Sequence, residues 1–510
     1  MTRLPAQTRG PAISRAQVGL RSERGPILGA IMISTALIAL DSTIIATAVP
    51  SVVKDLGGFS SFPWLFSAYL LAQAVTVPVY GKLADVIGRK PLLMFGITVF
   101  VAASLLCGLA WSMPVLIAGR LLQGLGAGAI LPMGMTVIGD LYSVQERAKV
   151  QGYLASVWGV SSVLGPVLGG LFSDYLSWRW AFLINLPLGA FALAALHRRF
   201  TENVVRREHA LDVRGALLLT SGCSLLILGL LEGGNGWAWR STTSYAVLGA
   251  AALLLLAFSQ VERRAAEPVL PPWVFQRRVL VAGNLAAVGI GALIVGLSTY
   301  VPTWAQGVLG TGAVEAGLAL GALTMGWPIT AALSGRVYLR IGFRDTALIG
   351  AGLAVLGATL TALLPRDATI WHLAGTLFVT GLGMGLSSAP LVVALQSVVG
   401  WDRRGVVTGT NMFCRSIGSA VGAAVFGAIA NNRLSQELAS GPAGATDVDG
   451  TLQALSAGGS VAAAAQDGLH AAVHGVFIGV AVTAVLIAVA IALLPRRTQA
   501  LVFPSSEPVA

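Results

Sequence analysis

The sequence predicts an all-α polytopic membrane protein with about fourteen transmembrane helices, and three observations support this prediction. The chain has 510 residues, of which 55% are hydrophobic and only 11% are charged, whereas a soluble domain carries about 25% charged residues. Its apolar runs are about twenty residues long, as a helix needs to cross the ~30 Å hydrocarbon core of a bilayer. Its 62 glycines would weaken soluble helices but let membrane helices approach closely.

Each predicted span holds about 17–27 residues, enough to cross the bilayer with some tilt. The first run is too long for a cleaved signal peptide, so we interpret it as a retained helix. The predicted spans are 27–50, 63–82, 91–112, 114–138, 150–172, 180–197, 214–231, 244–262, 280–305, 314–338, 346–364, 370–396, 405–430 and 472–494.

The lysines and arginines test this count, because cytoplasmic loops carry an excess of them. With a cytoplasmic N-terminus, most of the 33 fall at the cytoplasmic side. Removing one span would reverse every later loop, so an even number of spans with both termini cytoplasmic is predicted. The net charge of +11 then follows from topology and requires no nucleic-acid partner. The exceptions are Lys54, Arg179, Arg240, Arg366 and Arg433 outside, and Arg120 and Arg415 within spans.

An internal repeat indicates how the spans are grouped. Gly81 and Gly88, after the second span, match Gly335 and Gly342 after the tenth. The glycines of spans five and thirteen also match, and both pairs of spans are eight apart. We therefore predict a duplicated six-helix unit with two helices inserted between the copies, a 6+2+6 arrangement in which the repeat interface holds the site.

The domain boundaries follow from this grouping. The Ala/Gly/Ser-rich segment 431–471 is interpreted as a long flexible outer loop, with a lid over the substrate as the alternative. The predicted parts are a cytoplasmic tail (1–26), an N-terminal six-helix bundle (27–199), two inserted helices (200–262), a cytoplasmic linker (263–279), a C-terminal six-helix bundle (280–494) and a cytoplasmic tail (495–510).

A single carboxyl group lies deep within a predicted span. Asp41 follows Leu40 in the first span, and a charge at the centre of a span costs about 2.5–3.5 kcal/mol on insertion scales. Such a group is expected to face a polar cavity and to bind a proton or a partner. We interpret Asp41 as a proton carrier, with an ion pair that only fixes helix packing as the alternative.

Arg120 and Gln123 in the fourth span are the second candidate feature. They are three residues apart and share one helix face, with Gly124 beside them. At 1.5 Å per residue, Arg120 lies about 9 Å and Asp41 about 13 Å from the outer surface. We hypothesise that Arg120 pairs with Asp41 in one state and releases it in another, and a permanent structural pair is the alternative.

The fifth span is rich in glycine and contains a proline. Its marked positions are Gly152, Gly165, Pro166, Gly169 and Gly170. Glycines let helices pack closely and proline kinks a helix. We interpret this span as a pliable helix at the interface of the two halves, although ordinary glycine-mediated packing explains the same residues.

Charged residues gather at the cytoplasmic end of the first bundle. Asp85 and Arg89 are one turn apart, and Asp140 ends the fourth span on the same side. They are interpreted as a charge network, with a purely topological role as the alternative. The second copy has Leu339 and Phe343 at the positions of Asp85 and Arg89, so no equivalent network is expected there.

Two further features are weaker. Asn411 and Arg415 lie one turn apart in span thirteen, and we treat them either as polar residues of a central cavity or as a structural pair. The run Trp178-Arg179-Trp180 opens the sixth span at the outer surface, where aromatic residues commonly anchor helices.

The sequence also argues against several functions. The chain has no G-x-x-x-x-G-K-[ST] loop, so ATP hydrolysis is not expected to drive it. It has no H-E-x-x-H motif or Cys/His cluster that would predict a metal site. Because no catalytic pair or signalling domain is apparent, neither an enzyme nor a receptor is favoured, and no cofactor is expected.

The 6+2+6 arrangement and these motifs together resemble the fourteen-span drug:proton antiporter branch of the major facilitator superfamily, over nearly the whole chain. The resemblance implies a role for Arg120 in proton coupling, an exporter motif from Gly152 to Gly170, and a latch at Asp85 that holds the cytoplasmic face closed. Ser161 stands where similar proteins usually carry another glycine, and a residue this small should preserve close packing.

The expected function is proton-driven efflux of amphipathic drugs or toxic compounds, as in antibiotic resistance, by a monomeric multi-pass antiporter of the inner (cytoplasmic) membrane. Protons, a small-molecule substrate and the lipid bilayer are the expected partners. Each 100 mV contributes ~2.3 kcal/mol per proton that enters. Export of a dedicated endogenous metabolite or lipid is the alternative. The sequence identifies neither the substrate nor its charge, and it does not distinguish protons from sodium.

Overall fold

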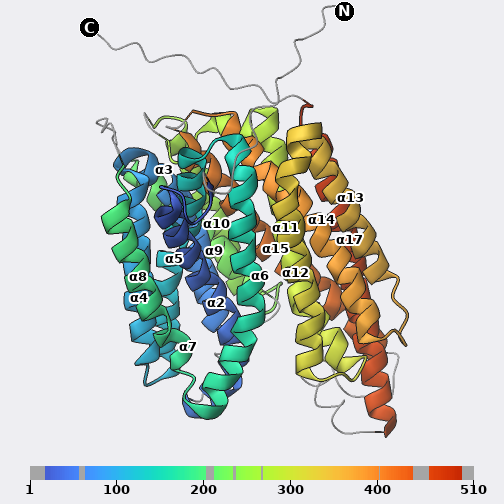
Figure 1. The fold of residues 1–510 in the computed structure, drawn as a ribbon. Helices are drawn as coiled ribbons and strands as arrows, with labels where there is room; N and C mark the ends of the chain where they lie inside the picture. The colour runs from blue at the N-terminus through green and yellow to red at the C-terminus, as the bar shows by residue number, and fades with distance from the viewer. Residues whose placement is uncertain are drawn as a thin grey trace, which may run out of the picture.

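The computed structural model describes residues 18–56, 64–202, 212–233, 237–265, 268–400, 403–439 and 459–496. Within these residues the fold is all-helical, as predicted, and the only β-type pairing described is an isolated bridge between Gly233 and Trp237. Figure 1 shows long helices that run side by side along a common direction.

The helices are α2 (Gly25–Leu56), α3 (Trp64–Ile87), α4 (Arg89–Gly108), α5 (Met113–Leu141), α6 (Val144–Tyr175), α7 (Trp180–Leu183), α8 (Asn185–Arg199), α9 (Val213–Glu232), α10 (Thr242–Glu262), the 3₁₀ helix η2 (Pro272–Phe275), α11 (Arg278–Gly307), α12 (Ala313–Ile341), α13 (Phe343–Ala362), α14 (Ile370–Ser397), α15 (Arg404–Ala439) and α17 (Gly459–Ala492).

In the described chain, 12 helices are long and apolar enough to cross a membrane. They comprise α2 to α5, the α7–α8 pair, α10 to α15 and α17. The other two predicted spans, 150–172 and 214–231, fall on α6, which is not among the twelve, and on α9, whose apolar stretch Arg214–Leu230 is shorter. The chain is thus a multi-pass membrane protein, and the count of fourteen remains a prediction.

The predicted repeat has a structural counterpart at two helix junctions. Gly88 joins α3 to α4 with a φ of 99°, and Gly342 joins α12 to α13 with a φ of 90°. A residue with a side chain is strained at such values of φ. The matched glycines of the sequence therefore mark two equivalent tight junctions between consecutive helices.

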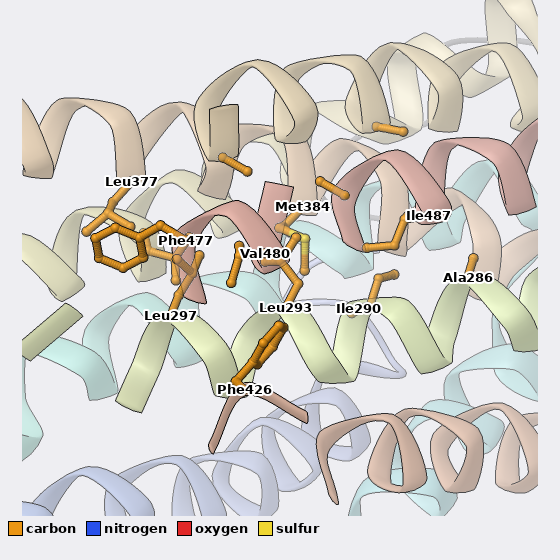
Figure 2. Packing of buried hydrophobic residues seen from close by; sticks show 14 of the residues in the cluster. Ala286, Ile290, Leu293, Leu297, Leu377, Met384, Phe426, Phe477, Val480 and Ile487 are labelled. Carbon is orange, nitrogen blue, oxygen red and sulfur yellow. The ribbon is translucent and has the colours of Figure 1, made fainter. Parts of the chain in front are cut away.

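Buried apolar side chains form separate clusters along the chain. One cluster contains only residues between 274 and 494, and Figure 2 shows Leu293 and Leu297 of α11 packed beside Phe477 and Val480 of α17. A second cluster contains only residues between 18 and 200. A third is shared by α3, α9 and α15, so α9 joins the two groups of helices.

The two groups also contact each other directly, α3 against α15 and α6 against α12. A Cβ atom added to Gly81 would lie 2.8 Å from the carbonyl oxygen of Gly405 and 3.3 Å from the Cα atom of Gly409. At the second contact, a Cβ atom added to Gly152 would lie 3.2 Å from the Cβ atom of Ala332. Glycine is therefore what allows both crossings to be this close.

The prediction of a flexible loop over 431–471 is wrong at both ends of this range. Helix α15 continues to Ala439 and α17 already begins at Gly459, while 440–458 lie outside the described residues. The four alanines at 462–465 explain the early start of α17, because alanine has the highest helix propensity of all residues.

The α3–α15 crossing gives a first test. Gly81→Leu is expected to lower the free energy of unfolding by about 1–3 kcal/mol, because it forces a side chain into a packed contact. The melting temperature of the purified protein in detergent measures this loss. Gly352→Leu on α13 is the matched control, because nothing lies within 4 Å of a Cβ atom added there. An equal loss in both variants would contradict the close crossing.

Candidate functional site

The Asp41 carboxylate on α2 and the Arg120 guanidinium on α5 form a buried ion pair. The Nη1 atom of Arg120 lies 2.6 Å from Oδ2 of Asp41, and both side chains are only 1% exposed. The similar depths of the two residues in the sequence made this contact feasible, and the structure brings them together.

Gln123 completes the predicted trio. It lies one turn after Arg120 on α5, accepts a hydrogen bond from Nη1 of Arg120 at 2.9 Å and donates one to Oδ1 of Asp41 at 3.1 Å. Its amide nitrogen also lies 2.8 Å from the hydroxyl oxygen of Ser104 on α4. The carboxylate is thus held on both of its oxygens.

Three residues that the sequence analysis did not select surround this trio. Asn185 at the start of α8 places its amide nitrogen 3.5 Å from Oδ1 of Asp41 and 3.3 Å from Oγ of Ser104. The guanidinium carbon of Arg120 lies 4.3 Å from the ring centre of Tyr69. Ser104, Asn185 and Tyr69 are all buried polar residues, and their polarity within apolar runs was the signal that could have found them.

The backbone also holds Arg120, whose Nε atom donates to the carbonyl oxygen of Leu65 at 2.9 Å. Two polar atoms at the site are unsatisfied, the hydroxyl oxygen of Tyr69 and Oδ1 of Asn185, which have no hydrogen-bond partner among the described residues. A buried ion pair is tolerated only where further hydrogen bonds satisfy both charges, and this site meets that condition for Asp41 and Arg120.

The charged residues predicted to gather at the other end of the bundle are also in contact, because Arg89 binds both Asp85 and Asp140. Arg89 Nη2 lies 2.8 Å from Oδ1 of Asp85, and its Nε atom lies 3.2 Å from Oδ2 of Asp140. The Arg89 side chain is 1% exposed. Asp85, Arg89 and Asp140 are named the charge network below.

The second half of the chain takes part in this charge network. Arg404 at the start of α15 binds Oδ1 of Asp140 at 3.0 Å, and the backbone N–H groups of Gly405 and Val406 donate to Asp85 at 3.2 and 3.1 Å. The sequence indicated the trio but not these partners, because nothing in a sequence shows that α15 starts beside α3.

The glycine-rich motif of α6 connects the ion pair to the rest of the fold. Gly165 packs directly against Thr43, two residues after Asp41 on α2, and the Thr43 hydroxyl donates to the carbonyl oxygen of Ser161 at 3.2 Å. Gly169 is buried, and Gly170 has nothing within 4 Å of an added Cβ atom. Pro166 lies within α6, but its side chain is outside the described part of the structure.

Asn411 and Arg415 do not join the ion pair. Asn411 donates to α11, to the carbonyl oxygen of Gly283 at 3.1 Å and to Oδ1 of Asn284 at 3.3 Å. Arg415 makes no side-chain hydrogen bond or ion pair in the part of the chain that the structure describes. The structure therefore does not pair these two residues with each other.

At the C-terminal end of α2, Asp55 binds the predicted anchor. Trp178 donates to its Oδ2 atom at 3.0 Å and Arg179 at 2.8 Å, and this hydrogen bond from Arg179 holds the pKa of Asp55 below its usual value. Trp178 is buried and Trp180 is exposed, so the run joins two helices as well as presenting an aromatic side chain to the membrane surface.

The fold and the buried charges are those of a polytopic membrane transporter. Comparison with known families extends this: the model of the Major Facilitator Superfamily matches residues 31–423, and the chain belongs to this superfamily. Its members transport small molecules, and the chain is a transporter rather than an enzyme.

Curated relatives cover most of the chain. The multidrug transporter protein MdtP of Bacillus subtilis (strain 168) is 36% identical over 415 residues, 81% of this chain and 77% of the relative. Multidrug resistance protein 3 of the same organism is 34% identical over 413 residues, 81% of this chain and 80% of the relative. The rubrofusarin-specific efflux pump aurT of Gibberella zeae is 31% identical over 421 residues, 80% and 77% of the two chains.

Among solved structures, the human organic anion transporter MFSD10 (TETRAN) has a similar fold. The TM-score is 0.61 with 15% sequence identity, over 93% of this chain and 99% of that chain. At this identity the similarity concerns the fold alone.

The ion pair leads to a stability prediction. Arg120→Ala is expected to lower the free energy of unfolding by about 3–5 kcal/mol, because it leaves a buried carboxylate without its counter-charge. Arg179→Ala, which removes the exposed pair with Asp55 and a hydrogen bond to the carbonyl oxygen of Ala110, should cost less. Thermal unfolding in detergent at neutral pH compares the two variants.

A double variant makes this test sharper. Asp41→Asn combined with Arg120→Gln removes both charges and should be less destabilised than the sum of the single variants, because neither charge is left alone. Strictly additive losses would mean that the two residues do not interact energetically.

Proposed function

We propose that the protein exports amphipathic compounds across the cytoplasmic membrane in exchange for protons, by alternating access. The observation that carries this proposal is the buried network in which Asp41 is held by Arg120 and Gln123. Several relatives are named as multidrug transporters or efflux pumps, which supports export of drug-like or toxic substrates.

Asp41 is the proton carrier in this proposal. In the structure its carboxylate accepts hydrogen bonds from Arg120 and Gln123. Protonation removes the charge and with it the Coulomb attraction to Arg120, which is strong in a desolvated site. The pair then separates, and α2 and α5 are free to change their packing.

The charge network is the proposed cytoplasmic latch. It links the ends of α3 and α5 to the start of α15, through Asp85, Asp140 and Arg404. Breaking these contacts would let the two groups of helices tip apart at this end while they close at the other. The contacts are made in the described conformation, which supports a closed latch at this end.

In this proposal, helix α6 carries the conformational change from the ion pair to the second half. It contacts α2 through Gly165 and α12 through Gly152. Small residues at both contacts let the helix slide without side-chain clashes. A shift of α2 on protonation of Asp41 would therefore move α6 against α12.

The membrane topology is part of the proposal. Fourteen spans are obtained when α6 and α9 are added to the twelve helices that meet the length and composition criteria. The contacts of α6 with α2 and α12 and of α9 with α3 and α15 support placing both within the bundle. The end of the molecule that carries most of the lysines and arginines would face the cytoplasm. Residues 27–199 and 280–494 would form the two bundles, and residues 200–262 the inserted pair of helices.

Export of one dedicated compound is the second candidate. The relative aurT is named as a rubrofusarin-specific pump, so similar chains include single-substrate exporters. Deletion of the gene that leaves drug resistance unchanged, together with retention of one metabolite in the cell, would favour this candidate over multidrug efflux.

Dye transport in inverted membrane vesicles tests the proposed function. With an imposed pH gradient, the wild type should take up an amphipathic dye, and Asp41→Asn should abolish the gradient-dependent part, because the amide cannot release a proton. Asp55→Asn at the outer surface is the control and should retain uptake.

Two results would contradict this function. Uptake by Asp41→Asn at the wild-type rate would exclude Asp41 as the carrier. Uptake that persists after the pH gradient is collapsed but disappears without a sodium gradient would assign the coupling to sodium.

A further inference from the structure

Three charged residues lie deep within the predicted spans, and only two of them neutralise each other. Asp41 and Arg120 form the buried ion pair. Arg415 on α15 is partly buried and has no ion pair and no side-chain hydrogen bond in the described chain. The interior of the described helices thus retains one uncompensated positive charge.

Arg120 and Arg415 differ in the number of partners that their side chains have. Arg120 binds a carboxylate, an amide oxygen, a backbone carbonyl and an aromatic ring. Arg415 starts from the same cost of about 2.5–3.5 kcal/mol for a charge within the bilayer and has none of these partners. Charged residues within membrane-spanning helices commonly mark a substrate or ion pathway.

A second unsatisfied donor lies on a neighbouring helix. The side-chain nitrogen of Asn284 on α11 is buried and has no hydrogen-bond partner among the described residues, and the residue is 5% exposed. The orientation of this amide is fixed by its neighbour: Asn411 donates to the carbonyl oxygen of Gly283, so the Asn284 atom facing Asn411 must be the acceptor oxygen. The free atom of Asn284 is therefore an N–H donor.

The two donors belong to one region of the fold. Arg415 follows Asn411 by one turn of α15, and Asn411 binds Asn284. Arg415 lies about 16 Å from the start of α15 at 1.5 Å per residue, near the middle of the membrane. Helix α15 packs against α11 on one side and against α3 of the other group of helices on another, so this region borders the interface of the two halves.

We propose that Arg415 and Asn284 bind the anionic group of exported amphipathic compounds, so that the transporter favours organic anions over cations. This inference rests on the proposed export function and names its substrate class.

The chemistry of the two donors selects the ligand. A guanidinium and an amide N–H offer hydrogen atoms and no acceptor, which suits carboxylate or sulfonate oxygens. Arginine binds such groups through two parallel hydrogen bonds. A cationic compound would meet an unpaired positive charge within the membrane-spanning helices and be repelled, which provides discrimination as well as affinity.

A pair of matched probes tests the proposal. Anilinonaphthalene sulfonate is an anion, and phenylnaphthylamine has the same aromatic rings without the sulfonate. Both are fluorescent, and their pH-driven uptake into inverted vesicles containing the full-length protein can be compared. The wild type should show a lower KM for the anion than for the neutral probe.

The variants give the decisive comparison. Arg415→Gln should raise the KM ratio of anion to neutral probe about tenfold or more, which is the effect of losing one charge-assisted hydrogen bond. Asn284→Ala should raise it less, and Arg415→Lys should restore part of the preference. Arg433→Gln is the control, because this arginine lies near the outer end of the same helix, outside the subsite.

An unchanged ratio in Arg415→Gln, or a wild type without preference for the anion, would overturn the anion subsite. If Arg415→Gln fails to fold, binding of the anion to the purified wild type is measured instead, by its fluorescence and by competition with inorganic salts, and absence of binding overturns the proposal. The proposed function is tested separately, because absence of pH-driven uptake of both probes would contradict it whatever the KM ratio.

Discussion

The cost of desolvating charge is the constraint on which the rest of this structure depends. Asp41 and Arg120 are both almost completely withdrawn from solvent, and neither would be tolerated there alone. Gln123, Ser104 and Asn185 supply the hydrogen bonds that allow the pair to be buried. Helices α2, α4, α5 and α8 are therefore held together at one polar point within an apolar bundle.

Because the packing at this site depends on charge, a change in the protonation of Asp41 is suited to switch it between two states. One proton on Asp41 removes the attraction that the surrounding dipoles are arranged to support. The adjacent Thr43 is bound to Ser161 of α6, and α6 reaches the second half at α12. The glycine-rich helix α6 and the charge network thus provide two separate sets of contacts between the two halves.

Much of the fold and of the candidate site could be predicted from the sequence. The length of the apolar runs predicted the helices, and the depths of Asp41 and Arg120 made their contact feasible because a helix has a fixed rise. The start of α17 differs from the predicted loop, because its alanines favour a helix even in a segment of low-complexity composition. The partners Asn185, Tyr69 and Arg404 were not selected, because they come from helices whose neighbours a single sequence does not specify. The sequence places Asn411 and Arg415 one turn apart on one helix. Only the tertiary contacts show that Asn411 binds α11 and not Arg415.

The most direct test of the central claim is to count protons when a substrate binds. Purified protein in weakly buffered detergent near neutral pH is mixed with an amphipathic substrate, and the pH of the solution is followed. Proton release is expected from the wild type and not from Asp41→Asn, because substrate binding favours the conformation in which Asp41 is ionised and paired. Equal release from both proteins would contradict Asp41 as the group that exchanges a proton for substrate.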